Sequence, residues 1–268
     1  MKQSPSLKAI SIQSENAAGM CRQITQYLGE QLGISIEFVN DIPWQEREHL
    51  LDTQQAQLGW ICGLPYIWKA DQEPSSIELV AAPVMRHPRY QQRPIYYSDV
   101  IVNRDSDYYN FANLRGASWA YNEPHSQSGY NITRYHLAMQ GEYKGYFGRV
   151  VEAGSHLQAL EMVLERRIDA TALDSTVFEM ELETRPHLRT QVRAIETFRP
   201  SPMPPWVVTT NVPLALREAI RRAFWNMHKT VEGRNILGRG QIQKMARVED
   251  QDYDPIREMT RMADQVVW

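Results

Sequence analysis

The apolar positions of the chain follow two spacings, one typical of strands and the other of helices. Residues 7–12 alternate as a strand does, and residues 17–32 then place apolar side chains three and four positions apart, as one helix face requires. A β-branched strand at 34–39, a helix through Leu50 and a short buried strand before the Gly/Pro turn at 63–66 follow. This order of elements is typical of an α/β protein with a mainly parallel sheet.

The later part of the chain repeats the same order. A long strand at 95–102 and a short one at 206–209 are predicted to cross between two lobes, and four prolines between residues 200 and 205 indicate a stiff connector before the second of them. The other strands are predicted at 77–84, 119–121, 149–153, 169–173 and 192–197. Helices are predicted at 126–139, 154–166, 174–183 and 213–228, with shorter pieces from 232 and 255.

The helix predicted near the middle of the chain has the most distinctive start. Ser126 is a good N-cap residue, and Gln127, Ser128, Gly129 and Tyr130 fill the first turn. Free backbone N–H groups and serine hydroxyls at the positive end of a helix dipole can bind an anion without a lysine. A capped helix start that binds nothing is the alternative, and these residues alone leave both open.

Two further helices begin with similar polar residues directly after a strand. One starts at residues 154–156, which include His156, and the other at 174–176, which include Asp174. In an open parallel sheet, the carboxyl ends of the strands and the helix starts that follow them lie along one edge. The three starts therefore predict a polar ligand site at that edge.

Composition and charge narrow the choice of function. The 268 residues are 43% hydrophobic and 23% charged, as in ordinary globular proteins, with a net charge of -3. Without a dense basic cluster, nucleic acid is not an expected partner. No apolar run approaches the ~20 residues of a membrane span.

The N-terminus and the cysteines bear on the cellular compartment. Because no apolar signal core follows Met1, either the chain is cytoplasmic or a leader has been removed. Cys21 and Cys62 are either two thiols or one disulfide, so they do not decide between these alternatives.

The candidate residues do not predict catalysis. His125, Ser126, Ser128 and Asp174 supply the residue types of a nucleophile, a base and an orienting acid. They lack the Gly-x-Ser-x-Gly turn of a nucleophilic serine, and a histidine next to the serine in sequence is poorly placed as its base. The spacings of metal-ligating His or Cys pairs are also missing. We therefore expect a protein that is not an enzyme, with no metal and no cofactor.

Several segments, taken in chain order, resemble one known family. They include Tyr-Ser-Asp-Val-Ile-Val at 97–102, Ser-Gln-Ser-Gly-Tyr within 119–131 and Met-Pro-Pro-Trp-Val-Val at 203–208. The remaining segments are 58–66, 111–116, 154–156 and 169–175. As an ordered set they resemble the substrate-binding proteins of phosphate, phosphite and phosphonate ABC transporters.

This resemblance implies the type II fold of periplasmic binding proteins. Each of two α/β lobes would hold a mainly parallel sheet flanked by helices, and two crossing strands would join the lobes. Lobe 1 would comprise residues 1–100 and 206–268, lobe 2 residues 101–205, with the ligand in the cleft between them.

The resemblance also implies site residues. The turn at 126–130 would hold a tetrahedral oxyanion with backbone N–H groups and hydroxyls. Tyr66 and Asp174 match an aromatic hydroxyl and a carboxylate of the family's cleft. Tyr97, through its aromatic ring, and His156, through its place at a helix start, complete the expected ligand-binding set.

The expected function is the capture of a small oxyanion by a monomeric protein. The oxyanion would be a phosphonate, phosphite or phosphate-like compound, and the protein would present it to an ABC transporter. The partners are then this ligand and, if the chain is exported, the permease subunits, with a periplasmic or cell-surface location implied by the resemblance. Two alternatives on the same fold stay open: an enzyme, and a cytoplasmic sensor module for a small anionic metabolite.

Overall fold

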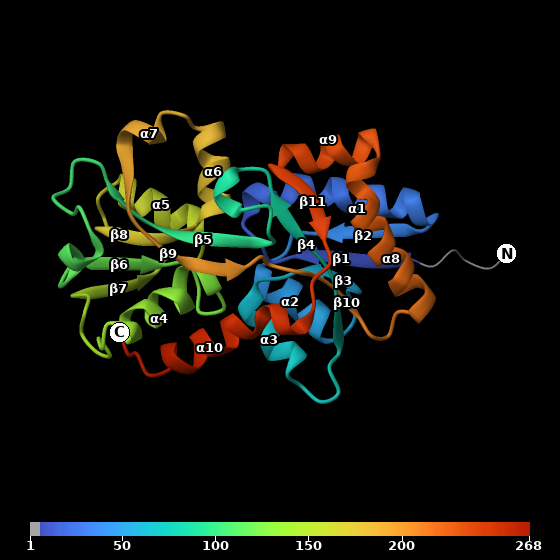
Figure 1. Cartoon of the computed structure of the whole chain (residues 1–268), viewed down its shortest axis with the longest axis horizontal. Coiled ribbons are helices and arrows are strands. Elements are labelled where there is room, and N and C mark those ends of the chain that lie inside the picture. The colour runs from blue at the N-terminus through green and yellow to red at the C-terminus, as the bar shows by residue number, and fades with distance from the viewer. Residues whose placement is uncertain (1–5) are drawn as a thin grey trace. The chain divides into compact units, whose positions relative to one another are not determined.

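The structure, a computed structural model, describes residues 6–268 and divides into two compact units (Figure 1). Unit 1 holds the residues up to Ile95 together with Met203–Tyr253, and unit 2 holds Tyr96–Pro202 together with Asp254–Trp268. The chain therefore passes from one unit to the other three times, after residues 95, 202 and 253.

The unit boundaries differ from the expected division into 1–100 with 206–268 and 101–205. The largest difference concerns the C-terminal segment 254–268, which was expected in the first lobe. This segment belongs to unit 2, because helix α10 (Asp254–Ala263) packs along helix α4 (Ile132–Met139) there. A helical passage thus joins the units in addition to the two expected crossing strands.

Unit 1 is built on a mixed sheet. Its strands are β1 (Ser6–Ser11), β2 (Ser35–Val39), β3 (Leu58–Trp60), β4 (Ile77–Met85), β10 (Trp206–Thr209) and β11 (Ile242–Ala246). Their order is β11-β4-β10-β3-β1-β2. Strand β1 pairs in parallel with β2 and β3, whereas β10 runs antiparallel to β3 and β4, and β11 antiparallel to β4.

Helices cover both faces of this sheet. Figure 1 shows α1 (Ala18–Leu32) and α9 (Val231–Arg239) on one side, and α2 (Trp44–Asp52) and α3 (Gly63–Ala70) on the other. Helix α8 (Leu214–Asn226) packs against α1 and β4. The connections include the short helical turns η1 (Glu15–Ala17), η2 (Pro88–Tyr90), η5 (Met227–Lys229) and η6 (Asp250–Tyr253).

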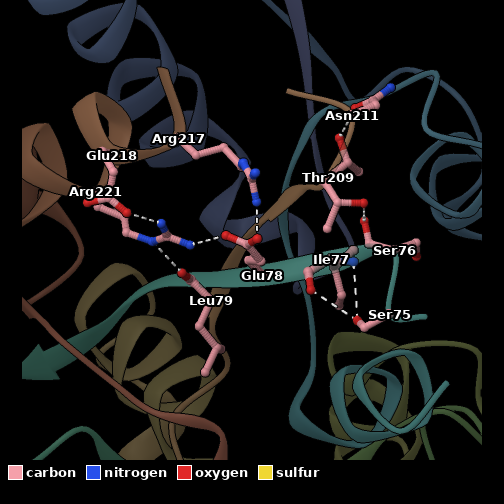
Figure 2. Close-up of polar contacts among 11 residues, drawn as sticks. Ser75, Ser76, Ile77, Glu78, Leu79, Thr209, Asn211, Arg217, Glu218 and Arg221 are labelled. Atoms are coloured by element: carbon pink, nitrogen blue, oxygen red, sulfur yellow. Dashed lines mark hydrogen bonds and ion pairs between the residues drawn. The ribbon is translucent and has the colours of Figure 1, made fainter. Parts of the chain in front are cut away.

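A charged cluster ties α8 to β4 (Figure 2). The Glu78 carboxylate, on β4, binds the guanidinium groups of Arg217 and Arg221, which lie four residues apart on α8. Arg221 also donates through Nε to Leu79 O at 2.9 Å and pairs with Glu218. The ion pairs of Glu78 with two arginines of α8 therefore hold this helix against the sheet.

Unit 2 is built on a second mixed sheet. Its strands are β5 (Ile95–Asn103), β6 (Ser118–Tyr121), β7 (Arg149–Glu152), β8 (Ala170–Asp174) and β9 (Val192–Pro202), in the order β7-β6-β8-β5-β9. Strand β6 is parallel to β7 and β8, and β5 is antiparallel to β8. Three strands, β5, β10 and β11, depart from the parallel pairing expected of most strands in these sheets. Strands β5 and β10 each begin at a passage between the units, so no helical crossover makes them parallel to their neighbours.

The two faces of this sheet carry different cores. On one face, α4 and α10 cover an aromatic cluster around Trp119, Phe147 and the turn η3 (Phe111–Leu114) (Figure 1). On the other face lie α5 (His156–Leu164), α6 (Ser175–Thr184) and α7 (Leu188–Gln191), over an aliphatic core.

Cys21 and Cys62 do not form a disulfide, so of the two alternatives left open by the sequence the structure has two thiols. Burial inside α1 raises the pKa of the Cys21 thiol to about 12, so it stays protonated and unreactive. Among the described residues, no helix combines the length and the apolar character needed to cross a membrane.

Candidate functional site

Three helix starts follow neighbouring parallel strands of unit 2. Strands β7, β6 and β8 lie side by side, and each leads into a helical segment through a polar N-cap residue. Ser126 Oγ and Ser155 Oγ each accept the N–H three residues on, at 3.0 and 3.1 Å. Asp174 Oδ1 accepts the N–H two residues on, at 2.7 Å. The predicted convergence of three polar helix starts on one sheet edge is therefore confirmed.

The chain between β6 and α4 forms the π-helical turn η4 (Gln127–Asn131) instead of the expected α-helical first turn. The Asn131 N–H donates to Ser126 O at 3.0 Å, which closes a wider ring than an α-helix has. Ser126 Oγ and Ser128 Oγ lie 3.4 Å apart within this turn, and both residues are buried, as is Gly129.

His156 joins the second helix start to this turn. Its Nε2 lies 2.8 Å from Ser128 Oγ. Burial lowers the pKa of the imidazole to about 4, so the ring is neutral at pH 7. The other ring nitrogen, Nδ1, is buried and has no hydrogen-bond partner among the described residues. A neutral, buried histidine with one uncommitted nitrogen is suited to hydrogen bonding with a ligand.

Gly129 permits a close approach that no other residue would allow. A Cβ at this position would lie 2.1 Å from Asn122 Oδ1 and 3.2 Å from His156 Cε1. Asn122 Oδ1 is itself buried and unpartnered within residues 6–268. Asn122 was not among the residues predicted from the sequence, although its place directly after β6 and close to the candidate turn was an available signal.

The Gln127 side chain, expected to contact the ligand, is fully buried. Its Nε2 lies 3.1 Å from Ser201 Oγ and 3.0 Å from Met259 Sδ, and its Oε1 accepts from Asn131 Nδ2 at 2.7 Å. These contacts hold the amide against β9 and α10. Gln127 is therefore buried as a whole residue, and its side chain is committed to contacts in the interior of unit 2.

The ring of Tyr130 belongs to an aromatic group near the C-terminus. It lies 4.9 Å from the Tyr121 ring and 5.3 Å from Trp268, measured between ring centroids. The Arg134 guanidinium sits 4.8 Å from the centre of the same ring. Tyr130 is half-buried, so the expected residue lies beside the turn with its ring packed on neighbours from unit 2.

Asp174 acts as the cap of α6. Its Oδ1 accepts from both the N–H and the hydroxyl of Thr176 at 2.7 Å. Burial raises the pKa of this carboxyl to about 6, although the Thr176 bonds oppose the rise. Tyr97 lies on the adjacent strand β5, where its N–H donates to Ser175 Oγ at 3.0 Å. The two expected residues thus meet at the start of α6.

Tyr66 lies in unit 1 and is engaged in internal contacts. Its hydroxyl donates to Asp250 Oδ1 at 2.7 Å, and its ring packs on Tyr253 with centroids 4.5 Å apart. Unit 1 has two other polar groups that the sequence analysis did not select. Gln13 Nε2 and Ser14 Oγ, in the loop after β1, are buried atoms without partners in the described part of the chain.

The arrangement around Ser128 supplies hydrogen-bonding groups rather than a catalytic set. The Ser128–His156 pair has the spacing of a nucleophile and its base, but an orienting acid would have to bind His156 Nδ1, which has no such partner in the described chain. Within residues 6–268, no group of three or more His, Cys, Asp or Glu side chains is arranged to hold a metal.

Comparison with known proteins gives a family match and a shared fold. The family model of the ABC transporter phosphonate periplasmic substrate-binding proteins matches residues 10–253. A binding-protein component of an ABC phosphonate transporter from Pseudomonas aeruginosa superposes with a TM-score of 0.83 at 20% identity, covering 98% of this chain and 87% of that one. These values show a shared fold.

Two further solved structures have the same fold and hold different molecules. PhnD1 from Prochlorococcus marinus, in complex with methylphosphonate, has a TM-score of 0.85 at 17% identity and covers 97% of this chain and 99% of its own. A Xanthomonas citri protein bound to ATP has a TM-score of 0.75 at 16% identity, with 98% of each chain covered.

Proposed function

The chain belongs to the family of periplasmic substrate-binding proteins of phosphonate ABC transporters, and from this premise we propose that it captures a small phosphonate- or phosphate-like oxyanion at the turn of residues 126–130. Proteins of this family bind a transported substrate and are not enzymes, so nothing favours the enzymatic alternative. The proposed location is the periplasm, and the proposed macromolecular partners are the permease subunits of the transporter.

The observation that carries this proposal is the group formed by Ser126, Ser128, Gly129 and His156. Two serine hydroxyls, the first N–H groups of a helical segment and an uncommitted imidazole nitrogen lie together, all of them buried. Uncharged donors at the positive end of a helix dipole can hold an anion whose charge no lysine neutralises. A tetrahedral oxyanion offers three oxygens to such a group.

The energies are sufficient for tight binding. A hydrogen bond to a charged group contributes about 1.5–3 kcal/mol. Four such bonds, less the cost of immobilising a small ligand, give the ~8 kcal/mol that corresponds to a micromolar dissociation constant. Asp174 and Tyr97, at the start of α6, are proposed to contact the remainder of the ligand.

Calorimetric titration of the purified protein tests the proposal. Methylphosphonate, phosphite, inorganic phosphate, sulfate and ATP would each be titrated into the full chain at pH 7.5. We expect a micromolar or tighter dissociation constant for at least one of the first three ligands, and a weaker one for sulfate and ATP. Absence of binding by all three would overturn the proposal.

A serine substitution tests whether the ligand binds at the turn. Ser128→Ala should weaken binding about 10- to 100-fold, because one charge-assisted hydrogen bond is lost. Ser106→Ala is the matched control: this serine also belongs to unit 2, but it follows the far end of β5, and its hydroxyl donates to Asn103 O at 2.7 Å. Equal effects of the two substitutions would place the ligand elsewhere.

A further inference from the structure

The first side chain of the turn η4, that of Gln127, lies in the interior of unit 2. Gln127 is fully buried, and its amide group makes three hydrogen-bond contacts within unit 2. They are Nε2 to Ser201 Oγ (3.1 Å), Nε2 to Met259 Sδ (3.0 Å) and Oε1 to Asn131 Nδ2 (2.7 Å). Both ends of the amide are thus occupied by groups from other parts of the chain.

The last residue of the turn also contacts α10. Asn131 donates through Nδ2 to Thr260 Oγ1 at 3.2 Å. Because Met259 and Thr260 are successive residues of α10, both the first and the last residue of the turn are bonded to this helix. One helical turn further on, the Arg134 guanidinium donates to Val266 O at 3.1 Å.

The segments that Gln127 contacts are those through which the chain leaves and re-enters unit 2. Ser201 lies next to Pro202, the last residue before the chain passes to unit 1. Met259 lies in the helix that begins at Asp254, the first residue after the chain returns. The family match ends at residue 253, so α10 lies outside the region that the match describes.

We propose that Gln127 is a positioning residue that couples the anion turn to these two connecting segments. The inference rests on the proposed function, because it assumes that an oxyanion binds the backbone and hydroxyls of residues 126–130. Separating the turn from β9 or α10 would leave buried amide groups without partners, which is unfavourable. An anion that orders the turn therefore also orders the end of β9 and the middle of α10.

The geometry requires the amide of glutamine. Its Nε2 group provides the donor that two acceptors share, and its carbonyl accepts from Asn131. Methionine keeps the length and the apolar stem of the side chain but removes the donor and the carbonyl acceptor. Gln127→Met therefore breaks the link without opening a large cavity. Gln140→Met, at an exposed glutamine in the same unit, is the matched control.

Hydrogen–deuterium exchange with and without methylphosphonate or inorganic phosphate tests the coupling. In the wild-type protein, saturating ligand should slow exchange at least fivefold in the turn, in the peptide that contains Ser201 and in α10. In Gln127→Met, the ligand should bind about tenfold more weakly. At saturation the protection should then be confined to the turn. Gln140→Met should behave as the wild type does.

The outcomes separate the coupling from the proposed function. If the wild-type protein binds neither anion, both ideas are overturned. If it binds and the protection of α10 persists in Gln127→Met, only the coupling is overturned. Should Gln127→Met fail to fold, Met259→Leu removes the sulfur acceptor and keeps the volume. That variant should bind with unchanged protection of the turn and at least twofold less protection of α10; unchanged protection of α10 would refute the coupling.

Discussion

The two units share a strand arrangement but begin their helices differently. In each sheet the first strand of the parallel set lies between the next two: β1 between β2 and β3 in unit 1, and β6 between β7 and β8 in unit 2. An antiparallel strand follows on the same side, β10 beside β3 and β5 beside β8. The topology alone would therefore place equivalent helix starts along one edge of each sheet.

The two sheet edges differ in the side chains at these helix starts. In unit 2, Ser126, Ser155 and Asp174 each accept a backbone N–H. In the described part of unit 1, the N-cap positions of η1, α1, α2 and α3 make no side-chain cap bond, and two of them are Pro43 and Cys62. Both sheets thus offer such an edge, and the anion site that we propose lies on the edge whose caps are polar.

The largest expected effect comes from the glycine on which the unit 2 turn depends. Gly129→Ala would bring a methyl group against Asn122 Oδ1. We expect the affinity for the preferred oxyanion to fall at least ~100-fold and the free energy of unfolding to fall by about 1–3 kcal/mol. Calorimetry and urea denaturation measure the two quantities.

Gly19, in the first turn of α1 in unit 1, is the matched control. A Cβ there meets nothing within 4 Å, so Gly19→Ala should stabilise the protein by up to ~1 kcal/mol and leave the affinity unchanged. If Gly129→Ala binds the oxyanion as tightly as Gly19→Ala does, the anion site does not depend on the turn in unit 2.

The next largest effect is on the pH dependence of protein stability, to which Asp174, the cap of α6, should contribute. The folded state raises the pKa of Asp174 from 3.8 to about 6, so between these values it holds a proton that the unfolded chain has lost. Proton binding by Asp174 therefore contributes fully to the free energy of unfolding below pH 3.8. The contribution is lost as the pH rises through about 6, and the loss amounts to roughly 3 kcal/mol. Asp174→Asn cannot titrate. The free energy of unfolding of the variant, relative to the wild type, should therefore increase between pH 4 and pH 7.

The comparison between variant and wild type removes the effect of other titrating groups. Burial lowers the pKa of His136 and His156 to about 4, so these groups lower the stability as the pH falls from 6.5. Both proteins carry them, and their contribution cancels in the difference. A difference that stays constant from pH 4 to pH 7, measured by urea denaturation, would show that Asp174 titrates normally.

The smallest effect compares two serines at helix starts. Ser155 caps α5, and Ser155→Ala should lower the free energy of unfolding by about 1 kcal/mol. Ser14 occupies the N-cap of η1 without a cap bond, and its buried hydroxyl has no partner in the described chain. Ser14→Ala should change the stability by less than ~0.5 kcal/mol. A larger loss in Ser14→Ala than in Ser155→Ala would reverse the comparison between the units.

The features that the sequence predicted correctly depend on local patterns. Spacing of apolar residues fixed the order of strands and helices, and short-range hydrogen bonding made Ser126 and Asp174 recognisable as caps. The predicted resemblance is confirmed by the family match. Each of these signals lies within a few residues of the feature that it predicts.

The features that the sequence analysis missed depend on residues far apart along the chain. Gln127 turns inward because of Ser201 and Met259, which are 74 and 132 residues away. The hydroxyl of Tyr66 is taken by Asp250, 184 residues away. No local pattern indicates such partners, and for the same reason the pattern did not show that α10 packs on unit 2.

The aromatic group at the C-terminus gives the protein an optical reporter of its own. The indole of Trp268 stacks on Tyr121 at 5.7 Å and meets the ring of Tyr130, which belongs to the candidate turn. The protein has six other tryptophans, of which Trp60 and Trp206 stack on each other in the buried interior of unit 1, so a Trp268→Phe variant would identify the share of the emission that comes from Trp268. Changes in the order of the turn would therefore alter the emission of Trp268, and titrations could be followed by intrinsic fluorescence without a dye.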